Sequence, residues 1–460
     1  MTQTFQGNLR LNNQVAPLDA IPPGCETPGS ITTMVDIKDF EVETLGECRV
    51  DTPIESARFV EDDDHVMFHY CLKDLQAYFE AGQTPPYFEM AGPRRNIYFD
   101  PSKLKCGIVT CGGLCPGIND VIQAMVMELY YHYGVRSIFG FRYGFEGLAP
   151  KYKHSPLELN PDVVTDIYLQ GGTILGSSRG EQNVPEMVDT LERMNLGLLF
   201  AIGGDGTLRG AQAISQEIKR RNLKIGVIGI PKTIDNDISY VQNSFGFITA
   251  ISEARTAIYT AHIEALGARN GIGLVKLMGR ESGFIAAYAT LANADVNLCL
   301  VPESPFSLEG LMAEIQNRLE RRSHAVIVVA EGAGQEFFQA TSETDASGNV
   351  RLGDIGVFLK EKINQHFKKI GVDITLKYID PSYTIRSVRA NPYDSYFCLT
   401  LGHQAAHAGM AGRTNMLVGY WNGQFTHMPI SLAVSARKRI DPKGRLWNEV
   451  LASTGQPRTM

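Results

Sequence analysis

The stretch Leu196–Ala211 reads LGLLFAIGGDGTLRGA, and it decides the fold class of the chain. Its first half is a nearly continuous apolar run, which is typical of a strand buried on both faces of a parallel sheet. Its second half is a glycine-rich turn that leads into a helix-length segment, Leu208–Asn222. A buried strand followed by a tight turn and a helix is the repeating unit of α/β proteins.

The same unit recurs on both sides of this stretch. The other strand-length apolar runs are Cys106–Thr110, Ser137–Phe141, Ile225–Ile230, Ile272–Leu277, Val296–Val301, Ala325–Ala330 and Met416–Tyr420. The other helix-length segments include Asn119–Tyr133, Ser282–Asn293, Leu308–Arg321 and Ile355–Phe367. This alternation is too long for one doubly wound sheet, so we predict an α/β protein with two Rossmann-like domains and a cleft between them.

The boundaries of these domains follow from changes in composition along the chain. Residues 1–95 differ in composition from the rest of the chain, because they contain many turn formers. We expect them to form an N-terminal extension that packs on the body. We expect the first α/β domain to comprise residues 96–245 with part of 393–440, and the second to comprise residues 246–392. Residues 441–460 remain as a C-terminal tail. We interpret the acidic cluster in the extension, Glu61–Asp64, as a solvated surface.

Composition excludes several classes of protein. The chain has 460 residues and a formal net charge of −7, whereas nucleic-acid proteins normally carry a basic surplus. A locally basic pocket for an anionic ligand is still compatible with this charge. We find neither a membrane-length apolar run nor a signal peptide at the N-terminus. Eight cysteines without paired CxxC spacing predict free thiols in a reducing compartment, so we expect a cytoplasmic protein.

Because ligands bind beyond the carboxyl ends of the strands in such sheets, the residues after each apolar run are the candidates for chemistry. The first run is followed by CGGLCPGIND, residues 111–120. Gly112 and Gly113 allow close approach of a ligand to the backbone, and Asn119 or Asp120 can cap the following helix. Glycines before a helix N-terminus favour a phosphate site, although a plain strand–helix turn is an equal alternative.

The turn GGDGTLRGA, residues 203–211, differs from a dinucleotide loop. Gly204 and Gly206 are followed by Gly210, one position too late for the G-x-G-x-x-G fingerprint. It also places Asp205 at the strand tip. A carboxylate among phosphate-binding glycines is explained if it holds Mg²⁺, which bridges and neutralises the phosphates.

The turn PKTIDND, residues 231–237, brings a cation, a hydroxyl and carboxylates to one strand end. Asp and Asn are common turn formers, which is the plain alternative. Grouping Lys232, Thr233, Asp235 and Asp237 at one place is costly unless something binds there. A carboxylate at this position could take the proton from a sugar hydroxyl that attacks a phosphoryl group.

Three further strand or turn ends carry groups suited to phosphate or sugar. MGRESGFIA, residues 278–286, places Arg280 between two glycines at a helix start, where it can reach an oxyanion. EGAGQE places Glu331 at a strand tip, and GGTILGSSRGE carries Arg179 after a glycine-rich turn. Each feature alone is weak, but their joint occurrence favours a site.

Two sets of potential metal ligands have plainer explanations. Cys111 and Cys115 lack a second pair, so a metal site there is disfavoured. His403 and His407 are four apart on a predicted helix, but Gln404 stands where a zinc metalloprotease has its glutamate. We interpret both histidines as partly buried structural residues.

The motifs CGGLCPG, GGDGT, PKTIDND and MGRESGF, in this order, resemble the phosphofructokinase family from about Lys105 to about Gly419. Together with AGPRRNIYFD at residues 91–100, the sequence of these motifs is similar to the long-subunit, ATP-dependent branch of plants and trypanosomatids. The resemblance implies transfer of the γ-phosphoryl group of ATP, with Mg²⁺, to the 1-hydroxyl of fructose 6-phosphate in glycolysis. It implies an ATP/Mg-binding first α/β domain, a fructose 6-phosphate-binding second one, and a homotetramer.

The resemblance also implies roles for individual residues. Asp235 would be the general base, and the catalytic set would be Asp235, Thr233, Arg179 and Arg280. Asp205, with Asp237, would hold Mg²⁺. The donor phosphates would be bound by Gly113, Arg179, Gly180, Gly204, Asp205, Gly206 and Thr207. Fructose 6-phosphate would be bound by Thr233, Ile234, Asp235, Met278, Gly279, Arg280, Glu331, Tyr383 and Arg386, the last two at its 6-phosphate.

Two residues bear on the phosphoryl donor. Pyrophosphate-dependent relatives carry an Asp where this chain has Gly206, and its bulk and charge would oppose a nucleotide. Lys232 resembles those same pyrophosphate enzymes, but Gly206 with Lys232 is the pairing of the ATP-dependent long-subunit branch. We therefore favour ATP, with pyrophosphate as the alternative. A non-catalytic regulatory subunit is a further alternative, which predicts loss of acids that are in fact present.

The chain also departs from the short bacterial pattern. Gly271 falls where those enzymes have an Arg that crosses the subunit interface to the 6-phosphate. The His and Arg that normally follow the Arg386 position are missing, although Arg389 is nearby. Cross-subunit phosphate binding, and any allosteric site at that interface, therefore cannot be carried over.

Overall fold

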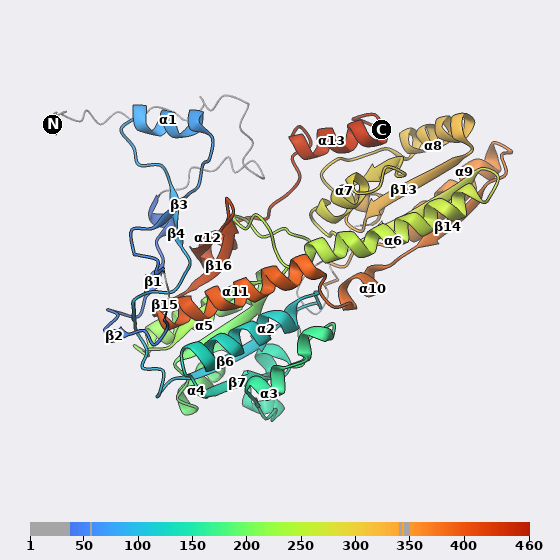
Figure 1. Ribbon diagram of the computed structural model, residues 1–460. Coiled ribbons are helices and arrows are strands. Elements are labelled where there is room, and N and C mark those ends of the chain that lie inside the picture. Colours follow the sequence, from blue (N-terminus) through green and yellow to red (C-terminus); the bar gives the residue numbers. More distant parts are fainter. Residues whose placement is uncertain (1–36, 56–57, 340–342, 345–349) are drawn as a thin grey trace.

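The computed structural model describes residues 37–55, 58–339, 343–344 and 350–460 (Figure 1). The turn-rich start of the N-terminal extension lies outside the described residues. Two main sheets form the framework, one of nine strands and one of four. They are accompanied by two-stranded pairs of β1 (Glu43–Thr44) with β15 (Arg413–Thr414) and of β2 (Val50–Asp51) with β5 (Asn96–Ile97).

The strand orders of the two main sheets are as follows. The larger sheet contains, in spatial order, β3 (His65–Met67), β4 (Tyr87–Met90), β17 (Gln424–Pro429), β16 (Met416–Trp421), β10 (Gly226–Pro231), β9 (Leu198–Gly203), β6 (Lys105–Thr110), β7 (Ser137–Phe141) and β8 (Leu157–Leu159). The smaller sheet contains β12 (Leu298–Leu300), β13 (His324–Ala330), β11 (Gly271–Leu277) and β14 (Thr375–Ile379).

The α-helices join and flank these strands. They are α1 (Leu72–Glu80), α2 (Ile118–Met127), α3 (Pro161–Val164), α4 (Val184–Arg193), α5 (Asp205–Arg220), α6 (Phe247–Leu266), α7 (Phe284–Leu291), α8 (Leu308–Arg322), α9 (Ile355–Lys369), α10 (Ser382–Ser387), α11 (Pro392–Met410), α12 (Ile430–Ala433) and α13 (Arg445–Thr454). A π-helical turn, Glu128–His132, continues α2, and 3₁₀ turns occur at Ile37–Phe40, Gly144–Leu148, Pro150–Tyr152, Ile167–Leu169 and Gln335–Phe337.

Each predicted apolar run forms a strand, and the two-domain α/β prediction is confirmed. In β9 and β10 every residue is buried, and both strands run parallel to their neighbours in the centre of the larger sheet. Alternate residues of these strands contact opposite helix layers, so Phe200 packs with α2 and α11 while Leu199 packs with α4 and α5. Such two-sided cover explains why the runs show no alternation of polar residues.

The predicted cap of the first helix is wrong. The N-cap position of α2 is Gly117, whose φ of 101° lies in the left-handed region, and a Cβ there would lie 2.5 Å from Cys398 Sγ. Asn119 instead lies inside the helix and is buried. Its Nδ2 donates to the carbonyls of Ile167 (3.0 Å) and Gln170 (3.1 Å), and its Oδ1 accepts from Ile174 N (2.9 Å). It therefore fixes the following loop rather than the helix end.

The N-terminal extension joins the larger sheet through β3 and β4. Strand β4 pairs antiparallel with β17, and the partly buried Glu89 on β4 accepts hydrogen bonds from Arg94 and Arg413, both at 2.9 Å. The acidic cluster is solvated as predicted, since Glu61, Asp62 and Asp63 are exposed, and Asp62 also accepts a hydrogen bond of 2.9 Å from Arg413. Two buried guanidinium groups need more than one carboxylate, which is the physical reason for this contact.

The C-terminal residues are also ordered against the body. Helix α13 packs on α7, with Trp447 buried between them. Gln456 exchanges hydrogen bonds with the backbone of Cys299 on β12, at 2.6 and 3.1 Å. The chain reaches α13 from α12 through an extended segment that runs between the two sheets, drawn in red in Figure 1.

Candidate active site

Each sheet has a point where the strand order reverses, and these points lie beside the predicted motifs. In the larger sheet β6 is followed in sequence by β7 on one side and then by β9 on the other. In the smaller sheet β11 lies between β13 and β14, with β13 and β14 on opposite sides of it. Ligands of open α/β sheets bind in the crevices beyond the carboxyl ends of strands at such points.

Three loops of the larger sheet lie next to one another there. The parallel register pairs Thr110 with Ile202 and Gly203 with Pro231, so β6, β9 and β10 end at one edge. The segments 112–113, 204–207 and 232–237 therefore meet in space, as the motifs predicted.

Positive charge converges on the loop after β6. Lys232 is buried and its Nζ donates to the carbonyl of Gly113 at 2.7 Å. A Cβ built on Gly113 would lie 3.4 Å from Arg179 Nη2 and 3.8 Å from Arg386 Nη1. Burial lowers the pKa of Lys232, and Arg179 and Arg386 lower it further. A group of cations this close together suits a polyanionic ligand.

The glycine-rich loop after β9 is open toward solvent. Asp205 is the first residue of α5, and its Oδ2 accepts a hydrogen bond of 3.0 Å from Arg209 Nε. Gly206 is exposed, and a Cβ built there would meet nothing within 4 Å. A longer side chain would therefore fit, but it would occupy the space in front of the glycine-rich loop. Gly204, with extended backbone, precedes the helix, and Thr207 is buried behind it.

The loop after β10 holds the predicted base. Oδ1 of Asp235 is buried and has no hydrogen-bond partner. Its neighbours are fixed, because Thr233 Oγ1 donates to Asp237 Oδ1 at 2.6 Å and Asn236 Oδ1 accepts from Ser244 N at 3.0 Å. Asn236 adopts a left-handed φ of 55°, which turns the loop back on itself. An unpartnered buried carboxylate oxygen in an ordered loop is available to a substrate hydroxyl.

The environment of Asp235 raises its pKa well above the usual value. Burial is the main cause, and the negative charges of Asp237 and Glu331 add to it. The backbone hydrogen bond and the charge of Arg280 act in the opposite direction. Because Glu331 and Arg280 follow strands of the smaller sheet, the site is shared between the two domains. A carboxylate with a raised pKa is better matched to accept a proton near neutral pH.

The loops of the smaller sheet support one another. Gly332 N donates to the carbonyl of Gly279, and Glu331 N donates to that of Leu277, each at 2.9 Å. A Cβ on Gly279, which has a φ of 125°, would lie 2.5 Å from Ser282 O. Burial raises the pKa of Glu331, although Arg280 and Lys276 oppose the rise. Arg280 Nη2 also donates to Val350 O at 2.6 Å.

The remaining predicted residues lie around this centre. Ile234 is buried, Met278 is partly buried beside the core, and Gly180 follows Arg179 with a φ of 99°. Tyr383 on α10 is 75% exposed, and the Arg386 guanidinium lies 4.7 Å from its ring centroid. Their roles stay predictions.

Sequence reasoning missed Arg437, which lies in the segment after α12. Its Nη1 is 3.5 Å from Asp237 Oδ2 and 3.3 Å from Glu281 Oε1, and its Nη2 is 4.0 Å from Asp205 Oδ2. The only signal in the sequence is the basic run SARKRI, residues 435–440, which by itself is typical of a solvated surface.

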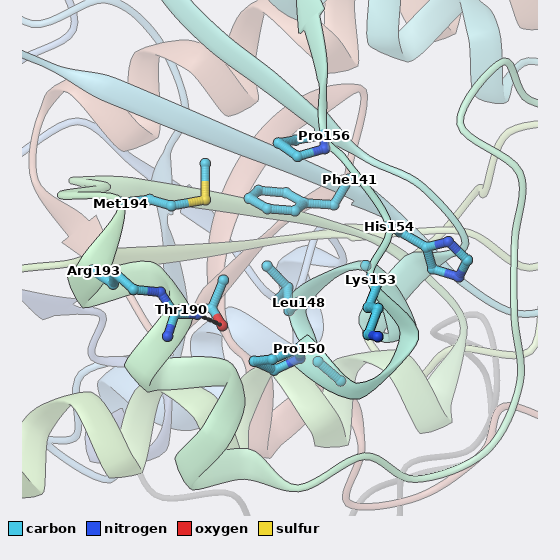
Figure 2. A pocket seen from close by; sticks show the side chains of 11 residues that line it. Phe141, Leu148, Pro150, Lys153, His154, Pro156, Thr190, Arg193 and Met194 are labelled. Carbon is cyan, nitrogen blue, oxygen red and sulfur yellow. Dashed lines mark hydrogen bonds between the residues drawn. The ribbon is translucent and has the colours of Figure 1, made fainter.

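A separate hollow is drawn in Figure 2. It lies between the turns that follow β7 and the helix α4, with Phe141 at its back and Lys153, His154 and Arg193 at its rim. None of the predicted site residues lines this hollow.

The predicted structural residues have well-defined partners. His407 is buried, with its Nδ1 2.9 Å from Tyr133 Oη and 3.8 Å from Glu128 Oε1, and burial lowers the pKa of His407 to about 3. His403 Nε2 lies 3.9 Å from Glu128 Oε2. The cysteines from Cys48 onward are free thiols, as predicted, and burial raises the pKa of Cys111 and of Cys115 to about 12.

Two wider properties also follow from the described residues. Within them, no helix is both long and apolar enough to cross a membrane. Nor does any group of three or more His, Cys, Asp or Glu side chains among them form a metal site by itself. Asp205 and Asp237 therefore form a two-carboxylate site at best. This is the arrangement that Mg²⁺ uses when substrate phosphates complete its shell.

The family model described as phosphofructokinase matches residues 105–409. An ATP-dependent 6-phosphofructokinase of Borreliella burgdorferi is 49% identical over 440 residues, covering 92% of this chain and 98% of the relative. One of Trypanosoma cruzi is 48% identical over 370 residues, covering 80% and 76%. An Arabidopsis thaliana relative, ATP-dependent 6-phosphofructokinase 5, chloroplastic, is 47% identical over 374 residues, covering 81% and 69%.

Solved structures have the same fold. A pyrophosphate-dependent phosphofructokinase of Marinobacter aquaeolei superposes with a TM-score of 0.64 at 18% identity, covering 76% of this chain and 91% of that one. Phosphofructokinase of Pichia pastoris in the T-state gives 0.59 at 19% identity, covering 77% and 37%. The likeness extends over both α/β domains, and together with the family model and the relatives it leads to one conclusion: the chain belongs to the phosphofructokinase family.

Proposed function

We propose that the chain is an ATP-dependent 6-phosphofructokinase, a kinase that converts fructose 6-phosphate and ATP to fructose 1,6-bisphosphate and ADP, the committed step of glycolysis. The single observation that carries this proposal is the buried, unpartnered Oδ1 of Asp235 at the junction of the two domains. The names of the curated relatives support it.

Asp235 acts as the general base in this proposal. Its carboxylate accepts the proton of the 1-hydroxyl while that oxygen forms a bond to the γ-phosphorus and the bond from phosphorus to the ADP oxygen breaks. Thr233 holds Asp237 through a 2.6 Å hydrogen bond, which keeps the neighbouring carboxylate in place. The raised pKa of Asp235 supports the assignment, because a base works best when its pKa is near the working pH.

Mg²⁺ fits the carboxylates of Asp205 and Asp237. The two residues follow adjacent strands, and both carboxylates lie within 4.0 Å of one guanidinium, that of Arg437, so they face a common space. When bound, the ion supplies positive charge that neutralises the donor phosphates.

Arginine and lysine side chains supply the remaining positive charge. Arg179 and Lys232, beside Gly113, are placed to hold the phosphates of the donor with the backbone of residues 204–207 and Gly180. We assign Arg280 to contact both substrates, and its interactions with Asp235 and Glu331 support this assignment. We assign the sugar phosphate to Glu331, Met278, Gly279, Ile234, Tyr383 and Arg386.

Two alternatives make different predictions. Pyrophosphate could be the donor, as Lys232 would suggest, but the open space at Gly206 and the ATP-dependent relatives favour ATP. A non-catalytic regulatory subunit would have no need of a buried base, and the presence of Asp205 and Asp235 disfavours it.

Domain roles, assembly and location belong to the same proposal. We assign ATP and Mg²⁺ to residues 96–245 with part of 393–440, and fructose 6-phosphate to residues 246–392. The donor loops follow strands of the larger sheet, while Arg280 and Glu331 follow strands of the smaller one, which supports this division. A homotetramer and a cytoplasmic location complete the proposal, to be checked by light scattering and by microscopy of tagged protein.

The test compares the two donors on one substrate. Initial rates are measured with fructose 6-phosphate and Mg²⁺, and with either ATP or pyrophosphate, for the parent and for Gly206→Asp. We expect turnover with ATP in the parent, and a loss of kcat/KM for ATP of about 10- to 200-fold in the variant from lost nucleotide binding. Its melting temperature should be unchanged, because the added side chain meets open space. Turnover of the parent with pyrophosphate alone would overturn the assignment of the donor.

A further inference from the structure

The segment that joins α12 to α13 passes directly through the site. We call residues 434–440 the C-terminal connector. Val434 O accepts a hydrogen bond of 2.6 Å from Arg209 Nη2, and Lys438 N donates to Asp237 O at 2.9 Å. Ile440 N donates to Glu303 Oε1 at 2.9 Å, on the side of the smaller sheet. The connector is thus fixed to loops of both domains, at the level of the predicted metal carboxylates.

Arg437 lies in the middle of this connector and faces three carboxylates from three strand ends. Asp205 follows β9, Asp237 follows β10, and Glu281 follows β11. The guanidinium nitrogens lie 3.3 to 4.0 Å from the three carboxylates. Its side chain is 29% exposed, so one side of the group is accessible from solvent.

These distances are longer than those of a direct, charge-assisted hydrogen bond. Charge-assisted N–H···O bonds are normally about 2.7–2.9 Å long. The bond from Arg209 Nε to Asp205 Oδ2, at 3.0 Å, comes close to this length. Arg437 is therefore centred among the acids instead of forming a bidentate bond with one of them. A guanidinium has five donors in a planar fork, which is the geometry that matches a phosphate group.

We propose that Arg437 contacts the phosphates of the phosphoryl donor. The inference rests on the proposed function, because it uses Asp205 and Asp237 as the ligands of the magnesium–nucleotide complex. Asp205 and Asp237 would hold the ion that neutralises the donor phosphates, so those phosphates would lie beside the same two carboxylates. A guanidinium 3.5 Å from Asp237 and 4.0 Å from Asp205 would then be within reach of the phosphate oxygens.

In the absence of nucleotide the same cation offsets the charge of the acids. With the magnesium–nucleotide complex bound, Asp205 and Asp237 would hold the ion, and Arg437 would turn its donors to the phosphates. The anchored backbone on both sides of Arg437 keeps the guanidinium within reach during this exchange. Arg437 is thereby a donor-binding residue contributed by the connector, outside the motifs that follow the strands.

The experiment measures binding, so that activity of the loaded enzyme is not the only readout. The affinity for the magnesium complex of a non-hydrolysable ATP analogue is measured by calorimetry for the parent, Arg437→Gln and Arg437→Lys. Arg439→Gln is the matched control, because Arg439 is exposed and pairs with Glu281 at 3.0 Å. We expect Arg437→Gln to lose about 10- to 100-fold in affinity, the effect of one charged hydrogen-bonding group. Arg437→Lys should regain part of the loss, and Arg439→Gln should bind as the parent does.

Binding of Mn²⁺ alone, followed by electron paramagnetic resonance, separates phosphate contact from support of the carboxylates. Arg437→Gln should bind Mn²⁺ at least as tightly as the parent, because a cation that faces the acids has been removed. Unchanged analogue binding in Arg437→Gln would overturn the inference, and so would a parallel loss of Mn²⁺ and analogue. If Arg437→Gln does not fold, Arg437→Lys decides by the same criteria, since full affinity with lysine would contradict phosphate recognition by the guanidinium fork.

These outcomes are distinguishable from failure of the proposed function. A parent that binds the magnesium–analogue complex but does not phosphorylate fructose 6-phosphate would contradict the proposed function and leave the contact of Arg437 intact. A parent that turns over normally, with an Arg437→Gln variant of unchanged analogue affinity, would contradict only the contact.

Discussion

At the scale of single residues, the chemistry depends on one carboxylate held in an unfavourable place. Asp235 lies near Asp237 and Glu331 with its Oδ1 buried, and burial together with these negative charges raises its pKa. Leaving Oδ1 without a partner is costly for folding, since a buried polar group without a hydrogen bond destabilises the native state. The cost is explained if a substrate hydroxyl completes the bonding of that oxygen.

Replacing Asp235 with Asn should lower kcat by about 10²- to 10⁴-fold, the range for loss of a general base. The base works only when deprotonated, and its pKa is raised, so kcat/KM of the parent should fall with decreasing pH at values above those of an ordinary aspartate. Asp235→Asn should lack this acid limb. Steady-state rates across pH and calorimetric binding of fructose 6-phosphate provide the measurements, and binding of the sugar should survive.

The control for this variant is Asp373→Asn, a change at an exposed acid on the surface. It should leave both kcat and the pH profile unchanged. An Asp235→Asn protein with turnover within about tenfold of the parent would show that another group removes the proton.

At the scale of secondary structure elements, the N-terminal extension is part of the larger sheet. Strand β4 pairs with β17, and its Glu89 lies against His427, Arg413 and Arg94. Burial alone would raise the pKa of Glu89, but His427, Arg413 and Arg94 outweigh it and hold the pKa well below the usual range. Strand β4 is therefore attached to the body by this charge network as well as by its backbone hydrogen bonds to β17.

Glu89→Gln should destabilise the protein by about 3–5 kcal/mol at pH 7, because it leaves buried cations without their carboxylate. The pKa of Glu89 is lowered on folding, so its contribution is present above the unfolded pKa of about 4.3 and declines as the pH falls below it. Urea unfolding at pH 7 and pH 3.5 should show the difference between parent and variant shrinking at the lower pH.

Glu47→Gln serves as the matched control, since Glu47 pairs with Arg49 at 2.7 Å in a fully accessible position. Its effect should stay within about 1 kcal/mol, the usual limit for a surface ion pair. Equal effects of the two substitutions would mean that the buried network does not hold β4 in place.

At the scale of the whole molecule, the site exists because two sheets present their switch points to each other. The C-terminal connector lies between them and carries Lys438, whose Nζ donates to the carbonyls of Val241 (2.8 Å) and Gln242 (3.3 Å). Burial lowers the pKa of Lys438 to about 7, although Asp237 acts in the opposite direction. Because this buried ammonium lies at the junction of the domains, the stability of the protein should depend on pH.

The sign of that coupling follows from proton binding. Between about pH 7 and the unfolded pKa of about 10.4 the unfolded chain binds more protons at this group than the folded one, so stability should rise with pH. We expect the parent to gain on the order of 2 kcal/mol of unfolding free energy from pH 7 to pH 9.5 relative to Lys438→Met. Denaturant unfolding at the two pH values measures this difference, and Lys443→Met, at an exposed site, should keep the slope of the parent. A Lys438→Met protein with the same slope as the parent would contradict the assignment.

The sequence by itself determined the α/β class, the strands that the apolar runs form, and the loops that carry the predicted site residues. The reason is local, because continuous apolar runs require two-sided burial and glycine or aspartate at a strand end needs a special backbone or a ligand. It also placed Asp205 and Asp235 just beyond the ends of two buried strands, and the structure shows that these strands are neighbours.

Only the tertiary structure decided how these groups act on one another. Asp235 meets Glu331 and Arg280 because the two sheets face each other, and no spacing along the chain encodes that contact. Arg437 reaches Asp237 across 200 positions of sequence, and Gly117 replaces Asn119 at the helix start because Cys398 of α11 packs against it. Such contacts depend on how whole elements pack, so a motif names the groups at the site while the packing sets their charge, their partners and their reach.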